Sequence, residues 1–137
     1  MNYFIAELMG TFLLILLGNA VVANVVLKNT KGNHSGWIVI TTGWALAVYV
    51  AVAVAAPYSG AHINPAVSIS LAIAGLFEWG LVLPYILAQF LGAMAGTFVV
   101  WFMYRDHYAI TDDNATKMAT FCTSPACLLY TSDAADD

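Results

Sequence analysis

The stretch PYSGAHINPAVSISLAIAG, residues 57–75, decides the fold of this chain. Residues 57–63 are too irregular for a helix, because proline, serine and glycine fall within seven positions. Asn64 and Pro65 then mark a helix start, since asparagine is a preferred N-cap and proline suits the first helical position. Gly75 is a natural stop. The resulting helix over residues 65–74 would be about 15 Å long, half of a hydrocarbon core of about 30 Å.

Three long uncharged segments surround this stretch, at residues 8–27, 38–56 and 81–104. Each is long enough to cross a bilayer as a helix. We therefore predict helices over about residues 3–27, 37–56 and 81–104, ended by Pro57 in the second case and by Arg105 in the third. The predicted fold is an all-α membrane protein with three transmembrane helices and one re-entrant half-helix.

The composition supports a membrane protein. Hydrophobic residues make up 61% of the 137 residues and charged residues only 9%, whereas a soluble domain carries about 25% charged residues. This excludes a nucleic-acid binder and an ordinary soluble enzyme. The two cysteines show no zinc-binding pattern, so neither a metal nor a cofactor is expected.

Residues 57–63 could reach about 23 Å if extended. The chain could thus return to the membrane midplane as extended backbone and come back as the half-helix, provided that protein or water lines its path. The alternative is a surface loop followed by an interfacial helix. The absence of charge and of a strongly polar face over residues 67–74 argues against that alternative.

Three motifs together resemble the aquaporin and glycerol-facilitator family: SGAHINPAVS at 59–68, AELMGT at 6–11 and AQFLGA at 88–93. The resemblance covers residues 1 to about 126. It implies an inverted repeat of three helices and a half-helix, present twice. This chain has one Asn-Pro-Ala motif, so it resembles the first repeat of such a channel. Residues 127–137 look like a translated sequencing adapter, which makes them a non-native tail; a genuine acidic tail is the alternative.

The residues of the half-helix start suggest how a solute would be handled. Asn64 can cap the helix through its side-chain oxygen, with Pro65 and Ala66 completing the motif, and its NH₂ group would then face the lumen as a donor. Gly60, Ala61, His62 and Ile63 would offer successive carbonyl acceptors if their backbone is extended. His62 can also be an ordinary core histidine that positions the loop.

Three more residues receive roles from the resemblance. Trp44 matches the position that supplies the aromatic wall at the narrowest point of the family's pore, where tryptophan is typical of glycerol facilitators. The alternative is that Trp44 fills an interface between helices. Glu7 would accept hydrogen bonds from N–H groups of the re-entrant backbone, unless it lies exposed at the surface. Gln89, on the third membrane helix, would be a second structural buttress inside the protein.

We interpret the chain as part of a passive channel for glycerol and water, not an enzyme. A water-selective channel and a small helix-binding membrane protein are the alternatives. The resemblance implies a homotetramer at full length, in a bacterial inner membrane. It also places Lys28, Lys31 and Arg105 outside, whereas the positive-inside rule would place them in the cytoplasm. On this interpretation the chain is multi-pass, contacts lipid and small neutral solutes, and binds no nucleic acid.

Overall fold

The computed structural model describes residues 1–123, and these contain helices but no strand. The helices are α1 (Tyr3–Val26), α2 (Trp37–Ser59), α3 (Pro65–Ile73), α4 (Trp79–Ile110) and α5 (Asn114–Ala119). By length and composition, α1, α2 and α4 can each cross a membrane. The predicted fold class is thereby confirmed. The tail predicted at residues 127–137 lies outside the described residues.

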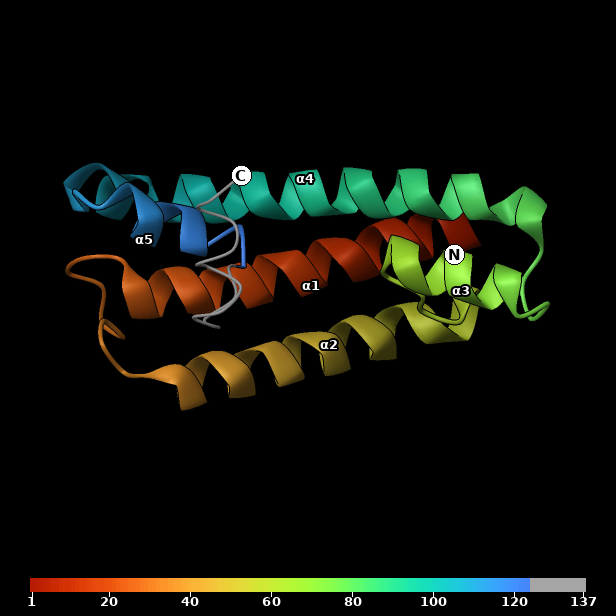
Figure 1. Cartoon of the computed structure of the whole chain (residues 1–137), viewed down its shortest axis with the longest axis horizontal. Helices are drawn as coiled ribbons and strands as arrows, with labels where there is room; N and C mark the ends of the chain where they lie inside the picture. The colour runs from red at the N-terminus through yellow and green to blue at the C-terminus, as the bar shows by residue number, and fades with distance from the viewer. Residues whose placement is uncertain (124–137) are drawn as a thin grey trace, which may run out of the picture.

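Helix α1 lies between α2 and α4, and α3 packs on α4 (Figure 1). Small residues allow the close approach of α4 to α1. A Cβ atom added at Gly92 would lie 2.2 Å from the carbonyl oxygen of Leu8, and one at Gly96 would lie 2.8 Å from that of Phe12. The GxxxG run of α4 therefore serves a helix contact within the chain, as small residues do in membrane helices generally.

Helix α2 continues past the proline that was expected to end it. It runs to Ser59, with Pro57 inside its last turn. Because proline has no N–H group, this position gives up the bond to the carbonyl four residues earlier, and the helix continues for only two more residues. The helix stops instead at Gly60, whose φ of 80° is left-handed and whose N–H donates to the carbonyl of Ala56.

Helix α4 is also longer than expected at both ends. We predicted residues 81–104, and the helix spans Trp79–Ile110. The charged residues from Arg105 onward mark where an apolar segment ends, but arginine, aspartate and histidine do not break a helix. The hydrophobic pattern therefore predicts the segment that can cross a membrane, and not the full length of the helix.

The half-helix α3 has a defined start and stop. The Oδ1 atom of Asn64 accepts from the backbone N–H of Ala66 at 2.8 Å. At the other end Gly75 adopts a φ of 73°, and the N–H of Leu76 donates to the carbonyl of Leu71 at 2.9 Å. This pattern satisfies the carbonyl groups of the last turn and turns the chain toward α4.

The start of α3 lies beside the first third of α1, which runs from Tyr3 to Val26. Ile63, directly before the cap, packs with Ala6, Ala51 and Ala55. Its N–H bonds Glu7, and its side chain lies against Gly10. The end of α2 and the start of α4, which α3 connects, lie at the same end of the bundle (Figure 1). Helix α3 therefore enters and leaves on one side.

Candidate functional site: the re-entrant loop and the tip of α3

The carboxylate of Glu7 is fully buried and gathers four hydrogen-bond donors. Its Oε1 accepts from Ser59 Oγ at 2.6 Å and from the backbone N–H of His62 at 2.9 Å. Its Oε2 accepts from the backbone N–H of Ile63 at 2.7 Å and from Gln89 Nε2 at 2.8 Å. A carboxylate has acceptor capacity for all four donors. Glu7 therefore fixes the loop between α2 and α3 against α1 and α4.

A second polar residue, Ser68, extends this network into α3. Ser68 is fully buried, and its Oγ lies 3.1 Å from Gln89 Nε2 and 3.0 Å from His62 Nδ1. The side chain of Gln89 thus bridges Glu7 and the half-helix. His62 is held by its backbone N–H on one side and by its ring on the other.

The backbone of the loop is wound rather than extended. Gly60, Ala61 and Ile63 have φ angles of 80°, 53° and 43°, all left-handed. Our expectation of an extended segment over residues 57–63 was wrong, because α2 uses residues 57–59 and only four residues remain to reverse the chain. Non-glycine residues in this region are strained, and the bonds to Glu7 hold Ile63 in place.

The N–H groups of this loop have hydrogen-bond partners, whereas its carbonyl groups have none within residues 1–123. The N–H groups of His62 and Ile63 face Glu7, and that of Ala61 donates to Ser59 Oγ at 3.1 Å. The carbonyl oxygens of residues 60–63 accept no hydrogen bond from any part of residues 1–123. Gly60 is exposed and Ala61 half-buried. The loop can therefore offer acceptors to a solute.

The tip of α3 presents an exposed donor. Asn64 uses Oδ1 for the cap, and the residue is exposed, with Ala66 exposed and Pro65 half-buried. Its NH₂ group is thus available beside the N-terminus of a helix, which carries about half a positive charge.

An aromatic cluster of Tyr3, Phe77 and Tyr85 packs against the loop at His62. The Tyr85 hydroxyl donates to the carbonyl of Ser59 at 3.0 Å. Its ring lies 4.9 Å from the His62 ring and stacks on Tyr3 at 5.4 Å, while Phe77 meets His62 at 4.5 Å. Sequence reasoning gave no role to Ser59, Ser68 or Tyr85; the signal available was polar side chains in otherwise apolar segments.

Trp44 lies away from this network. It is 15 positions before the end of α2, about 22 Å along the helix axis. Its ring packs over Gly18, where an added Cβ would come within 2.6 Å of ring atoms. Trp44 also lines a hollow between the last turns of α1, the first turns of α2 and the segment around α5. The structure thus brings together Glu7, Gln89 and residues 62–63, and leaves Trp44 as a separate feature.

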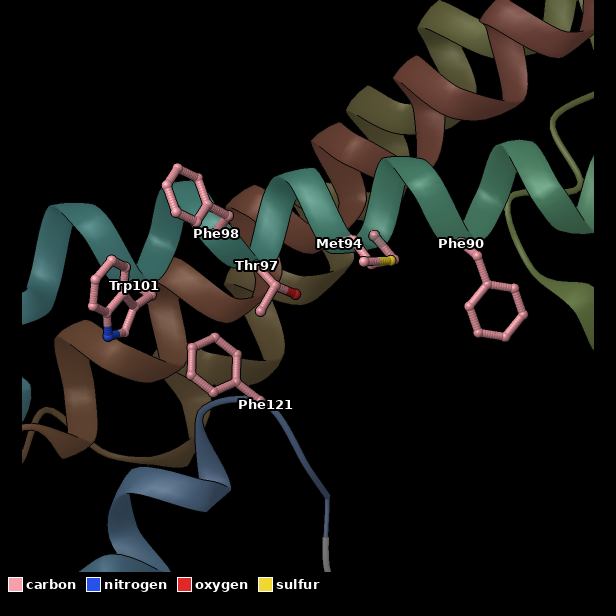
Figure 2. A pocket seen from close by; sticks show the side chains of 7 residues that line it. Phe90, Met94, Thr97, Phe98, Trp101 and Phe121 are labelled. Atoms are coloured by element: carbon pink, nitrogen blue, oxygen red, sulfur yellow. The ribbon is translucent and has the colours of Figure 1, made fainter.

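A second hollow lies on α4 and contains none of these residues. Figure 2 shows it lined by Phe90, Met94, Phe98 and Trp101, with Phe121 reaching across from the segment after α5. Its lining is almost entirely apolar. Within residues 1–123, no three histidine, cysteine, aspartate or glutamate side chains gather as they would around a metal ion.

Three membrane-length helices, a half-helix whose connections lie on one side of the bundle, and a loop whose N–H groups at residues 60–63 are all bonded describe an all-helical membrane protein with a re-entrant segment. The profile of the major intrinsic protein family matches residues 1–132. The chain belongs to this family, as its motifs predicted.

Relatives extend this assignment. The chain is 55% identical over 130 residues to the probable glycerol uptake facilitator protein of Thermotoga maritima, covering 95% of this chain and 56% of that protein. It is 55% identical over 126 residues to the glycerol uptake facilitator protein of Streptococcus pneumoniae, covering 92% and 54%. The aquaglyceroporin of Plasmodium falciparum is a structural neighbour, with a TM-score of 0.70, 39% identity, and coverage of 77% of this chain and 43% of that one. The chain spans about half the length of these relatives.

Proposed function

We propose that this chain forms the first half of a passive channel for glycerol and water. The observation that carries the proposal is the set of bonds from the re-entrant loop to Glu7. They occupy the N–H groups of His62 and Ile63, while the carbonyl groups of residues 60–63 have no partner within residues 1–123. The names of the Thermotoga maritima and Streptococcus pneumoniae relatives support glycerol as the solute.

The chemistry of the tip suits a neutral polyol. A solute that leaves bulk water needs replacement partners for its hydroxyl groups. Carbonyl oxygens of residues 60–63 would accept from those hydroxyls, and the NH₂ group of Asn64 would donate to their oxygen atoms. The positive end of α3 repels cations at the same point, so ions and protons would be excluded while neutral solutes pass.

Trp44 would contribute an apolar wall on the same path. Its ring would face the C–H edge of a polyol, while polar groups opposite would bind the hydroxyls. A water-selective channel remains the alternative within the class, and a helix-binding membrane protein without transport is the alternative outside it.

The second half of the pore would come from a second repeat. On this proposal the 137-residue chain alone conducts little, because half of the lumen wall is missing. The full-length protein would assemble as a homotetramer in a bacterial inner membrane, with the Lys28 end of the bundle facing outward. Bacterial relatives support this location.

The proposal is tested with a completed channel, in which residues 1–126 are joined to the C-terminal half of the Thermotoga maritima relative. Proteoliposomes containing it should take up glycerol at least tenfold faster than empty vesicles, and vesicles with the 137-residue chain should resemble empty ones. Rapid water flow without glycerol flow would favour the water-selective alternative. Neither flow, from protein shown to be inserted, would refute the channel.

A further inference from the structure

The proposed pore leaves the segment after α4 without a role, although this segment forms one side of a large hollow. The hollow has a volume of about 940 Å³ and lies at the end of the bundle away from α3. Helices α1 and α2 form two of its walls, with Trp44 among the lining residues. Its third wall consists of Thr116, Ala119, Cys122 and Thr123, from α5 and the residues that follow it.

The far end of this wall is attached firmly to α4. The Tyr108 hydroxyl and Thr120 Oγ1 lie 2.7 Å apart, and both residues are buried. The rings of Tyr108 and Phe121 stack at 5.7 Å. Figure 2 shows the Phe121 ring close to Thr97 and Trp101 of α4. Apolar packing and a buried hydrogen bond thus fix the end of the wall.

The near end is attached through Lys28, just after α1. Its N–H donates to Thr111 Oγ1 at 3.1 Å, and its carbonyl oxygen lies 2.9 Å from His107 Nδ1. Its Nζ pairs with the carboxylate of Asp112. Asp112 directly precedes Asp113, which caps α5 by accepting from the N–H groups of Ala115 and Thr116.

These contacts differ in strength. The two backbone contacts of Lys28 join the ends of α1 and α4 and involve no exposed charge on Lys28. The Lys28–Asp112 ion pair is the contact that reaches the start of α5, and its side chains are 53% and 87% exposed. Exposed ion pairs are weak and are screened by salt. The start of the α5 wall, beyond the buried Thr111, is therefore attached more weakly than its end at Thr120.

We propose that the α5 wall, residues 112–123, borders the solute entrance above Trp44, and that the Lys28–Asp112 ion pair limits the size of the polyol that enters by holding this wall in place. The inference rests on the proposed channel function. The lining suits such a solute, because it is largely apolar and includes Thr41 and Thr116. Their hydroxyl groups donate to the Trp37 carbonyl and to Asp113, and each hydroxyl oxygen keeps the capacity to accept a hydrogen bond. Release of the near end would widen the hollow without disturbing the network at Glu7.

Charge reversal in the completed channel tests this inference. Lys28→Glu and Asp112→Lys should each raise the permeability ratio of a five-carbon polyol, xylitol, to glycerol by about two- to fivefold, the range expected for an exposed pair. The double variant Lys28→Glu/Asp112→Lys restores the pair with its charges exchanged and should return the ratio to that of the parent. Lys31→Glu is the matched control, because it changes the same charge in the same loop at a residue with no ion pair within residues 1–123.

The outcomes separate the two proposals. If the parent channel does not transport glycerol, the proposed function fails. If the parent transports glycerol and both single variants keep its ratio, or if Lys31→Glu changes the ratio equally, the role of the ion pair is refuted.

A second measurement applies to the 137-residue chain itself and guards against variants that assemble poorly. Cys122 lines the hollow and is exposed. The substitution Cys127→Ser leaves Cys122 as the single cysteine for labelling. Its labelling by a bulky maleimide should be faster in Lys28→Glu and in Asp112→Lys than in Lys31→Glu. Equal labelling rates in all three would show that the ion pair does not hold the wall.

Discussion

Replacing the Glu7 carboxylate by an amide of the same shape is the sharpest perturbation of the loop. Glu7→Gln keeps the volume of the side chain but converts one acceptor oxygen into an NH₂ donor. In the structure one oxygen meets Ser59 Oγ and the N–H of His62, and the other meets the N–H of Ile63 and Gln89 Nε2. Two of these partners can adapt: the serine hydroxyl can rotate and accept, and the glutamine amide can flip.

The two backbone N–H groups cannot adapt. Whichever way the new amide turns, its NH₂ group faces the N–H of either His62 or Ile63, and one buried donor is left unsatisfied. An unsatisfied buried donor costs about 1–3 kcal/mol. The equilibrium ratio of the observed loop conformation, bonded to Glu7, to conformations without these bonds should therefore fall by roughly 5- to 150-fold.

The assay is glycerol uptake by proteoliposomes that contain the completed channel, measured by light scattering. Glu7→Gln should lower glycerol permeability at least fivefold while the protein still inserts and elutes as the parent does. Glu78→Gln is the matched control, because it makes the same chemical change at an exposed carboxylate that makes no capping hydrogen bond. Uptake by Glu7→Gln within twofold of the parent would refute the claim that the carboxylate holds the loop.

Three further predictions follow from individual contacts. Gly92→Ala should lower thermal stability in detergent by about 1–3 kcal/mol, since its Cβ would lie 2.2 Å from the Leu8 carbonyl oxygen, whereas Gly80→Ala, with open space around it, should stabilise by up to about 1 kcal/mol. Asn64→Asp keeps an acceptor for the cap but adds a charge at the tip, so glycerol flux should fall while the melting temperature stays near that of the parent. The Lys28 ammonium beside Asp112 lowers the pKa of that carboxyl below its ordinary value of 3.8, so the polyol ratio should stay constant from pH 8 to 5 and rise only in stronger acid; a change near pH 6 would point to another group.

The half-helix could be predicted from the sequence because its start and stop depend on local chemistry. Asparagine before proline and a glycine after an uncharged run are recognisable wherever they occur. The structure places α3 at Pro65–Ile73, within one residue of the predicted 65–74. The three membrane spans were equally visible, because they depend only on the length of an apolar segment.

The details of the loop could not be predicted in the same way. Pro57 reads as a helix end in isolation, yet α2 absorbs it because Gly60 provides a better stop three residues later. Ser59 and Ser68 are unremarkable in sequence, and they become part of the site only because folding brings them to Glu7 and Gln89. Such long-range polar contacts leave no periodic pattern in the chain.

The role of Glu7 also explains why strained backbone occurs here. Left-handed φ angles at Ala61 and Ile63 are unfavourable for residues with side chains. They accompany a loop in which the N–H groups of His62 and Ile63 meet one buried carboxylate and the carbonyl groups of residues 60–63 have no partner within residues 1–123. The strain is thus connected with the property that a solute path requires.

The claim on which the account depends is that α3 descends to the middle of the bilayer and returns. Spin labels attached to single cysteines at the exposed positions Ala66, Ser70 and Ile73 of the membrane-inserted chain measure this directly through their immersion depth. Ala66 should be deepest, near the bilayer centre, and Ile73 should lie about 10 Å closer to the surface. Equal depths for all three positions would show a helix lying flat on the membrane and would contradict the channel fold.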